Sequence, residues 1–308
     1  RGLGDVYKRQ DFHMLMLSRM GVACAHAIFW SIVTPLAVRV APAGKGSTAL
    51  SIVVAGSSIA LIVGLPLGRA IGIAVGWRVT FLIIAAIAFG VLGLLAAVLK
   101  KSPSDNNFSL RKLPALIKTP SLWGIYLLTL VAISGHFTAY SYIEPFLSRI
   151  AGLGNNAITV VLTLFGAVDL VGSFIFSRHY NNNVETFFKM AVAGLCFCLL
   201  MLLPASCTEW SAFLQCMLWG LSINFFNLSF QSEIIRHAPQ GTAVAMSIYS
   251  GIYNVGIGTG ALVGGSVCDG IGIRYIGYVG GAIALAAVIY CIRHVVPVLR
   301  RATAGAEI

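Results

Sequence analysis

An imidazole, a phenol and a carboxylate recur at four-residue spacing in the apolar segment 126–146. These groups belong to His136, Tyr140 and Glu144, which share one stripe if the segment is helical, because residues four apart are neighbours on a helix surface. Histidine changes its charge near neutral pH, so the stripe could serve a proton-coupled step. Pro145 predicts a break or kink at Glu144, which would free backbone carbonyls for a polar ligand. The alternative places Glu144 at the solvated end of the segment, with no chemical role.

Further ionisable side chains lie within apolar segments. Asp169 occupies the middle of GAVDLVGS, where a charged group costs about 2.5–3.5 kcal/mol, so it has a functional role or a basic partner. Arg19 and His26 are seven residues apart on one helical face, and Trp30 follows one turn later. This face is expected to line a cavity, with a packing histidine as the alternative. The proton-coupling candidates are Arg19, His26, His136, Glu144 and Asp169.

Amide and aromatic side chains form two more one-sided rows. Asn224, Asn227 and Gln231 share a face of the segment 211–235, and Ser247, Ser250 and Asn254 share a face of 243–268. Amides donate and accept hydrogen bonds, which suits sugar hydroxyls, and aromatic rings could stack on a sugar ring. Hydrogen bonding between helices is the equally open alternative. The substrate-binding candidates are Trp30, Tyr140, Trp219, Asn224, Asn227, Tyr249, Tyr253 and Asn254.

The elements that must hold these side chains are apolar helices of membrane length. Of the 308 residues 58% are hydrophobic and 10% are charged, whereas soluble domains carry roughly 25% charged residues. Runs of about 20 apolar residues recur, and the alternating pattern of a membrane barrel does not. The composition therefore predicts an all-α membrane protein. Its nine predicted spans are 14–38, 49–68, 78–99, 122–148, 157–178, 186–206, 211–235, 243–268 and 275–298.

One polar connection divides the chain. The segment 100–121, KKSPSDNNFSLRKLPALIKTPS, is basic and rich in proline, which predicts a linker between the bundles 11–99 and 122–308. Residues 1–10, RGLGDVYKRQ, are interpreted as a sequencing or vector scar and are excluded from fold reasoning. Six spans after a basic linker are typical of the major facilitator architecture. The three spans before it then predict that helices four to twelve of twelve are present.

Lysine and arginine are distributed unevenly between alternate loops. One side holds only Arg69, Arg78, Arg149 and Arg274, whereas the linker, its alternate loops and the C-terminal tail hold most of the rest. Positive charge accumulates on the cytoplasmic side of membrane proteins, so the linker and the C-terminus are expected in the cytoplasm.

Several classes of function are excluded by the same sequence. The net charge of +11 comes from loops, which argues against nucleic-acid binding, and the seven cysteines match no CxxC or zinc spacing. No HExxH, GxSxG, HxxxxD or phosphate-binding loop motif occurs, so an enzyme, a metal and a cofactor are not expected.

Four stretches carry a resemblance to a known family. They are SRMGVACAHAIFWSIVTPLAVRVAPAGK (18–45), GLPLGRAIGIAVGWRVTF (64–81), YLLTLVAISGHFTAYSYIEPF (126–146) and SGIYNVGIGTGALVGG (250–265). In order and spacing they resemble the sugar-efflux branch of the drug:proton antiporter group in the major facilitator superfamily, and most closely the bacterial arabinose/isopropyl-galactoside exporters.

The resemblance implies particular roles. Arg19 matches the fourth-helix arginine thought to assist proton transfer. The antiporter motif of the fifth helix corresponds to Gly64, Pro66 and Gly68, with Leu65 inserted and Arg69 in place of a second glycine. Glycines also recur every fourth residue over 64–76 and 256–264. They could serve static packing, a sliding contact between the two halves, or both at once.

The resulting expectation is a monomeric, proton-coupled exporter of sugars or related small polar molecules in the bacterial inner membrane. Drugs, amphiphiles or nucleosides are the alternative cargo for the same fold. Residues 11–308 alone are expected to insert into the bilayer but not to transport, because three helices that complete the cavity would be absent.

Overall fold

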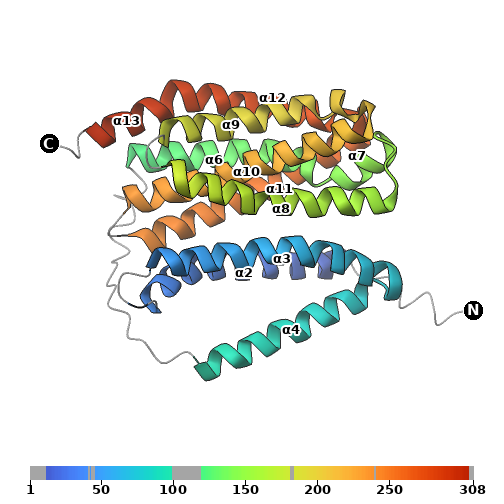
Figure 1. Ribbon diagram of the computed structural model, residues 1–308, viewed down its shortest axis with the longest axis horizontal. Helices are drawn as coiled ribbons and strands as arrows, with labels where there is room; N and C mark the ends of the chain where they lie inside the picture. The colour runs from blue at the N-terminus through green and yellow to red at the C-terminus, as the bar shows by residue number, and fades with distance from the viewer. Residues whose placement is uncertain are drawn as a thin grey trace, which may run out of the picture.

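The computed structural model describes residues 12–40, 42, 46–98, 119–180, 184–238 and 241–304, and these ranges are almost entirely helical. Some side chains within the helices, Arg19 among them, are not described. Long helices alternate in direction along one axis (Figure 1). The linker end is the end where α4 stops at Val98 and α6 starts at Pro120, and the far end is the opposite one.

Each of the nine predicted spans coincides with one helix or with a run of consecutive helical pieces. The three before the linker are α2 (Phe12–Val40), α3 (Gly46–Val75) and α4 (Trp77–Val98). The later elements are α6 (Pro120–Tyr140), α7 (Ile143–Arg149), α8 (Asn155–His179), α9 (Val184–Met201), η3 (Pro204–Cys207), α10 (Glu209–His237), α11 (Thr242–Asp269), η4 (Ile273–Tyr275), α12 (Ile276–Tyr290), the π-helical turn η5 (Cys291–Val295) and α13 (Val296–Ala304).

The core lies in the helices that follow the linker. Helix α6 packs against α11 and α12, α9 packs against α10 and α12, and α8 packs against α10. The buried apolar side chains of the described chain all fall between Leu122 and Leu299. The predicted second bundle, 122–308, is therefore a packed unit over its described residues.

The three helices before the linker are much less covered. Helix α2 packs on α11 and α3 on α8, while α4 extends away from the others beside α3 (Figure 1). No residue of α4 is buried, and Leu82 and Phe89 are about 70% exposed. Water solvates such a surface poorly, whereas lipid or protein covers it favourably.

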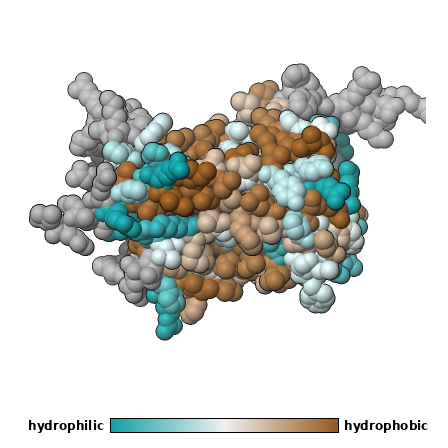
Figure 2. Space-filling view, turned by 90° about the horizontal axis from the view of Figure 1, so that it is seen from above, coloured by the Kyte–Doolittle hydropathy of each residue, from teal (hydrophilic) through white to brown (hydrophobic). Residues whose placement is uncertain are grey.

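The surface fits a membrane environment. Six helices in the described residues are long and apolar enough to cross a bilayer by length and composition. Figure 2 shows apolar side chains over much of the middle of one face and hydrophilic ones gathered toward its two ends. The helix bounds place Arg178, Lys189, Arg236 and Arg300 at the linker end, as the loop pattern predicts.

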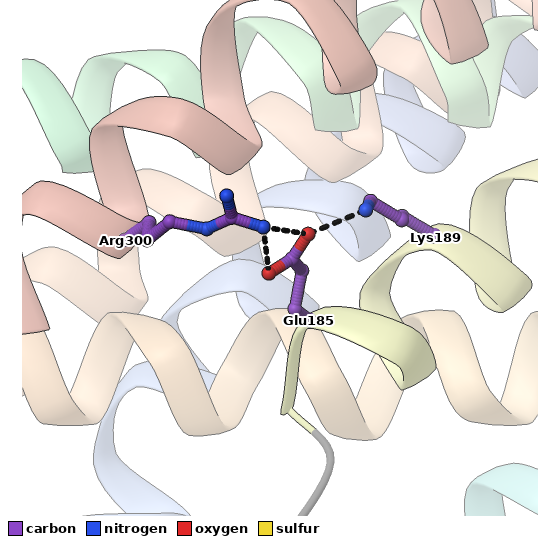
Figure 3. Close-up of polar contacts among 3 residues, drawn as sticks. All are labelled: Glu185, Lys189 and Arg300. Atoms are coloured by element: carbon purple, nitrogen blue, oxygen red, sulfur yellow. Dashed lines mark hydrogen bonds and ion pairs between the residues drawn. The ribbon is translucent and has the colours of Figure 1, made fainter.

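The C-terminal helix α13 is held at the linker end by charge. Arg300 Nη2 lies 2.8 and 2.7 Å from the two carboxylate oxygens of Glu185 on α9, and Lys189 pairs with the same carboxylate (Figure 3). Partly exposed pairs contribute modestly to stability. Their geometry nonetheless places α13, which follows the π-helical turn η5, beside the start of α9.

Two helix ends differ from the sequence prediction. Helix α3 continues to Val75 instead of ending near residue 68, and it ends where Gly76 adopts a φ of +89°, which glycine tolerates without strain. The break expected at Glu144 lies earlier, at Ser141–Tyr142, and Pro145 occupies the first turn of α7. A first-turn proline needs no hydrogen-bond donor, so it fits there and does not itself kink α7.

The glycine stripe of α11 packs inside the second bundle. A Cβ at Gly260 would lie 2.5 Å from Ser134 O of α6, and one at Gly256 would lie 2.9 Å from Ile133 Cγ2. A Cβ at Gly264 would clash with Thr138 O, which also belongs to α6. Static packing of this stripe within the second bundle is therefore present at Gly256–Gly264, and the sliding contact between halves stays a prediction. The stripe allows α6 and α11 to approach closely.

Candidate functional site

Four rings from three helices meet in the middle of the second bundle. His136 and Tyr140 of α6 stack with centroids 5.1 Å apart, and Trp219 of α10 packs edge-on against them at 5.4 and 6.0 Å. Phe165 of α8 lies 5.3 Å from Tyr140 and 5.8 Å from Trp219. We call His136, Tyr140, Phe165 and Trp219 the aromatic cluster.

The four rings differ in exposure. Trp219 is 0% exposed and His136 is 3% exposed, so a solute cannot touch either in this conformation, whereas Tyr140 and Phe165 are half-buried. Gly220 makes the packing possible, because a Cβ there would lie 2.8 Å from Phe165 O. Trp219 therefore exposes no ring face for the predicted stacking on a sugar in this arrangement. Tyr140 and Phe165 are the accessible rings.

A polar cluster adjoins these rings. The Asp169 carboxylate of α8 is near the side-chain amide of Asn224 on α10 and near the hydroxyls of Tyr140 and Tyr253. Asn227, one turn after Asn224, contacts the Tyr253 hydroxyl of α11. We call Asp169, Asn224, Asn227 and Tyr253 the polar cluster. It contains side chains from three helices, α8, α10 and α11, and the sequence does not predict which of them contact one another.

Asn224 has unused hydrogen-bonding capacity. Its Nδ2 donates to Ser173 Oγ at 3.4 Å, and its Oδ1 is buried with no hydrogen-bond partner among the described residues. A Cβ at Gly172 would lie 2.5 Å from this oxygen, so the glycine makes room for the amide. An unpaired buried acceptor is unfavourable unless a ligand or water supplies a donor.

The remaining substrate-binding candidates on α11, Tyr249 and Asn254, differ in their hydrogen bonding. The Tyr249 ring lies 5.9 Å from Tyr253, and its buried hydroxyl has no partner in the described structure. Asn254 Nδ2 donates to Ser250 O at 2.8 Å, within its own helix. Asn254 therefore lies outside the polar cluster, although it shares the predicted row with Ser250.

The candidates before the linker form a separate group. Trp30 Nε1 donates to His26 Nε2 at 2.8 Å, so these two residues share a face of α2, and the cavity expected beside that face stays a prediction. The side chain of Arg19 lies outside the described part. In α3, Gly64 has open space where a Cβ would project and Pro66 lies inside the helix. A Cβ at Gly68 would lie 4.0 Å from Thr80 Cγ2 of α4.

Glu144 joins the two parts of the chain. The break at Ser141–Tyr142 separates it from His136 and Tyr140, so the three do not share one stripe. Its carboxylate instead pairs with Arg69 of α3, whose Nη2 also donates to Asn155 Oδ1 at 3.1 Å. We call Arg69, Glu144 and Asn155 the far-end bridge. It ties α3 to α7 and α8 at the far end.

Sequence reasoning missed Phe165, Asn155 and Ser173. Phe165 precedes Asp169 by one helical turn, a spacing that could have drawn attention to it. Nothing in the sequence pairs Arg69 with Glu144, which lies 75 residues away. Among the described residues, no three His, Cys, Asp or Glu side chains gather as a metal site.

Comparison with known proteins defines the class. Residues 9–245 match the family model described as Major Facilitator Superfamily, which is most of the chain. The chain therefore belongs to the major facilitator superfamily of membrane transporters, as its resemblance implied. It is 46% identical over 280 residues to a "Probable sugar efflux transporter" of Helicobacter acinonychis, a match that covers 91% of this chain and 72% of that protein.

Proposed function

We propose that this protein exports a sugar across the bacterial inner membrane in exchange for protons, by alternating access and as a monomer. The linker and the C-terminus face the cytoplasm in this proposal, because lysine and arginine favour that side. The family supports transport of a small molecule, and the relative's name supports a sugar as cargo.

The observation that carries the sugar assignment is the polar cluster. A carboxylate, two amides and a phenol at membrane depth supply donors and acceptors for several hydroxyl groups. Such groups are unfavourable in lipid and are retained where they have a role. The half-buried rings of Tyr140 and Phe165 border this cluster and offer an apolar face to the cargo. Those rings alone would equally suit an amphiphile, and it is the amides that favour a sugar.

The polar cluster yields a test with an internal control. Asn227→Leu should weaken arabinose binding about tenfold, because a half-buried amide is lost and hydroxyls of the sugar remain unpaired. Asn254→Leu, on the neighbouring helix, should leave affinity unchanged, because that amide already bonds its own helix. Displacement of labelled arabinose from the purified full gene product gives both affinities. Equal losses in the two variants would refute the assignment, and displacement by amphiphiles alone would favour the alternative cargo.

Alternating access gives the far-end bridge a role. The cargo reaches opposite sides when the two halves rock against each other, so contacts between halves must break at one end in each cycle. The bridge connects α3 of the first half to α7 and α8 of the second. We therefore propose that it stabilises the conformation closed at the far end.

Reversing one charge of the bridge should open the far end. Arg69→Glu is expected to raise the labelling rate of a Thr159→Cys reporter by up to about fivefold, because a partly exposed ion pair contributes about 0.2–1 kcal/mol. The assay uses a membrane-impermeant maleimide on cells whose exposed native cysteines are replaced. Restoring the pair in Arg69→Glu/Glu144→Arg should restore slow labelling. Arg78→Glu, where the guanidinium stacks 4.6 Å from the Trp77 ring of its own helix, is the control. Unchanged labelling in Arg69→Glu would contradict the role of the bridge.

A further inference from the structure

His136 makes one directional contact at the centre of the second bundle. Trp219 Nε1 lies 3.0 Å from His136 Nδ1. An indole nitrogen always donates and never accepts, so Nδ1 must present a lone pair. A neutral imidazole carries its proton on one nitrogen, so the proton of His136 is on Nε2 in this conformation.

A second proton cannot be added without breaking this contact. An imidazolium carries hydrogen on both ring nitrogens, and the Nδ1 hydrogen would then face the indole hydrogen of Trp219. Both donors would be unpaired within a buried aromatic environment, where an unsatisfied polar group is unfavourable. The charge itself would also be removed from water, in a side chain that is 3% exposed.

The same contact determines where the accessible rings lie. Trp219 packs edge-on against both Tyr140 and Phe165, and His136 stacks on Tyr140 with an interplanar angle of 18°. Fixing the indole through its N–H therefore fixes the two half-buried rings that adjoin the polar cluster.

We propose that His136 is a positioning residue: it accepts the indole hydrogen bond of Trp219 and thereby holds Tyr140 and Phe165 against the cargo site, and it does not carry the coupled proton. This proposal rests on the proposed function for the meaning of the cargo site. It replaces the proton-coupling role that sequence spacing suggests for His136.

Two substitutions separate positioning from proton transfer. His136→Asn places an amide oxygen where Nδ1 lies and cannot titrate near neutral pH, whereas His136→Leu keeps apolar volume and removes the acceptor. The Asn variant is expected to retain the affinity for arabinose, the gradient-driven export and the pH profile of wild type. The Leu variant should bind arabinose about tenfold more weakly, with an unchanged pH profile and unchanged proton-to-sugar stoichiometry.

A second measurement reports the contact without any cargo. The indole N–H of Trp219, assigned in the NMR spectrum by its loss in Trp219→Phe, should be protected from hydrogen exchange in wild type and in His136→Asn. It should exchange faster in His136→Leu. In the Trp219→Phe background, the further change His136→Leu should have little effect on affinity, because the bond is already lost.

The outcomes distinguish the two ideas. If His136→Asn protects the indole N–H but abolishes gradient-driven export while sugar exchange continues, His136 carries the proton and the positioning proposal is wrong. If the indole N–H exchanges equally fast in wild type and in His136→Leu, the hydrogen bond is not the stabilising contact and the proposal is wrong. Failure of wild type to bind any sugar would refute the proposed cargo, and the exchange measurement would still decide the hydrogen bond.

Discussion

Asp169→Asn is expected to abolish gradient-driven sugar export while exchange of labelled sugar without a gradient continues. Asparagine has nearly the shape of aspartate and can still bond Asn224, so the cargo site should survive. The asparagine side chain cannot take up or release a proton, whereas a proton-coupled cycle needs at least one group that does so. Asp169 is the half-buried carboxylate of the polar cluster and lies at mid-span, where a change of charge acts directly on cargo contacts.

The measurement uses vesicles containing the full gene product. Gradient-driven movement of labelled arabinose should fall to the level of empty vesicles, and exchange should lose its dependence on pH. Asp269→Asn is the matched control, because Asp269 is exposed at the end of α11 and should not affect coupling. Gradient-driven export at the wild-type rate in Asp169→Asn would remove this carboxylate from the coupling mechanism.

Gly260→Leu is expected to prevent assembly of the second bundle, and Gly260→Ala to destabilise it by about 1–3 kcal/mol. A Cβ at this position would lie 2.5 Å from Ser134 O and 2.8 Å from Phe137 Cβ of α6. Both atoms belong to the most central helix, so α11 would have to move away. The displacement would also shift Tyr253 of the polar cluster relative to α10.

Gly258 supplies the control on the same helix. It is exposed, and a Cβ added there would have nothing within 4 Å. Gly258→Ala should therefore be neutral or stabilising, since alanine favours helix by about 1 kcal/mol over glycine. Thermal unfolding in detergent, followed by size-exclusion chromatography, compares the two alanine variants. A wild-type melting midpoint for Gly260→Ala would show that α6 and α11 are not in close contact.

The sequence alone predicts the helices and the family. Long apolar runs require helices because backbone groups in lipid must bond within their own segment, so length and composition define the spans. Their order, the basic linker and the four quoted stretches predict the major facilitator fold, which the family match confirms. The i, i+4 pair of His26 and Trp30 is likewise local, and its hydrogen bond is present.

Contacts between helices could not be predicted in the same way, because they depend on the rotation and approach of segments distant in sequence. The sequence grouped Glu144 with His136, whereas a break of two residues directs Glu144 to Arg69 of another helix. The glycines of α11 predicted close packing without naming α6 as the partner. The tautomer of His136 depends on Trp219, 83 residues away. Which polar groups are present is thus determined by the sequence, and what each one does is decided by the neighbour that packing places beside it.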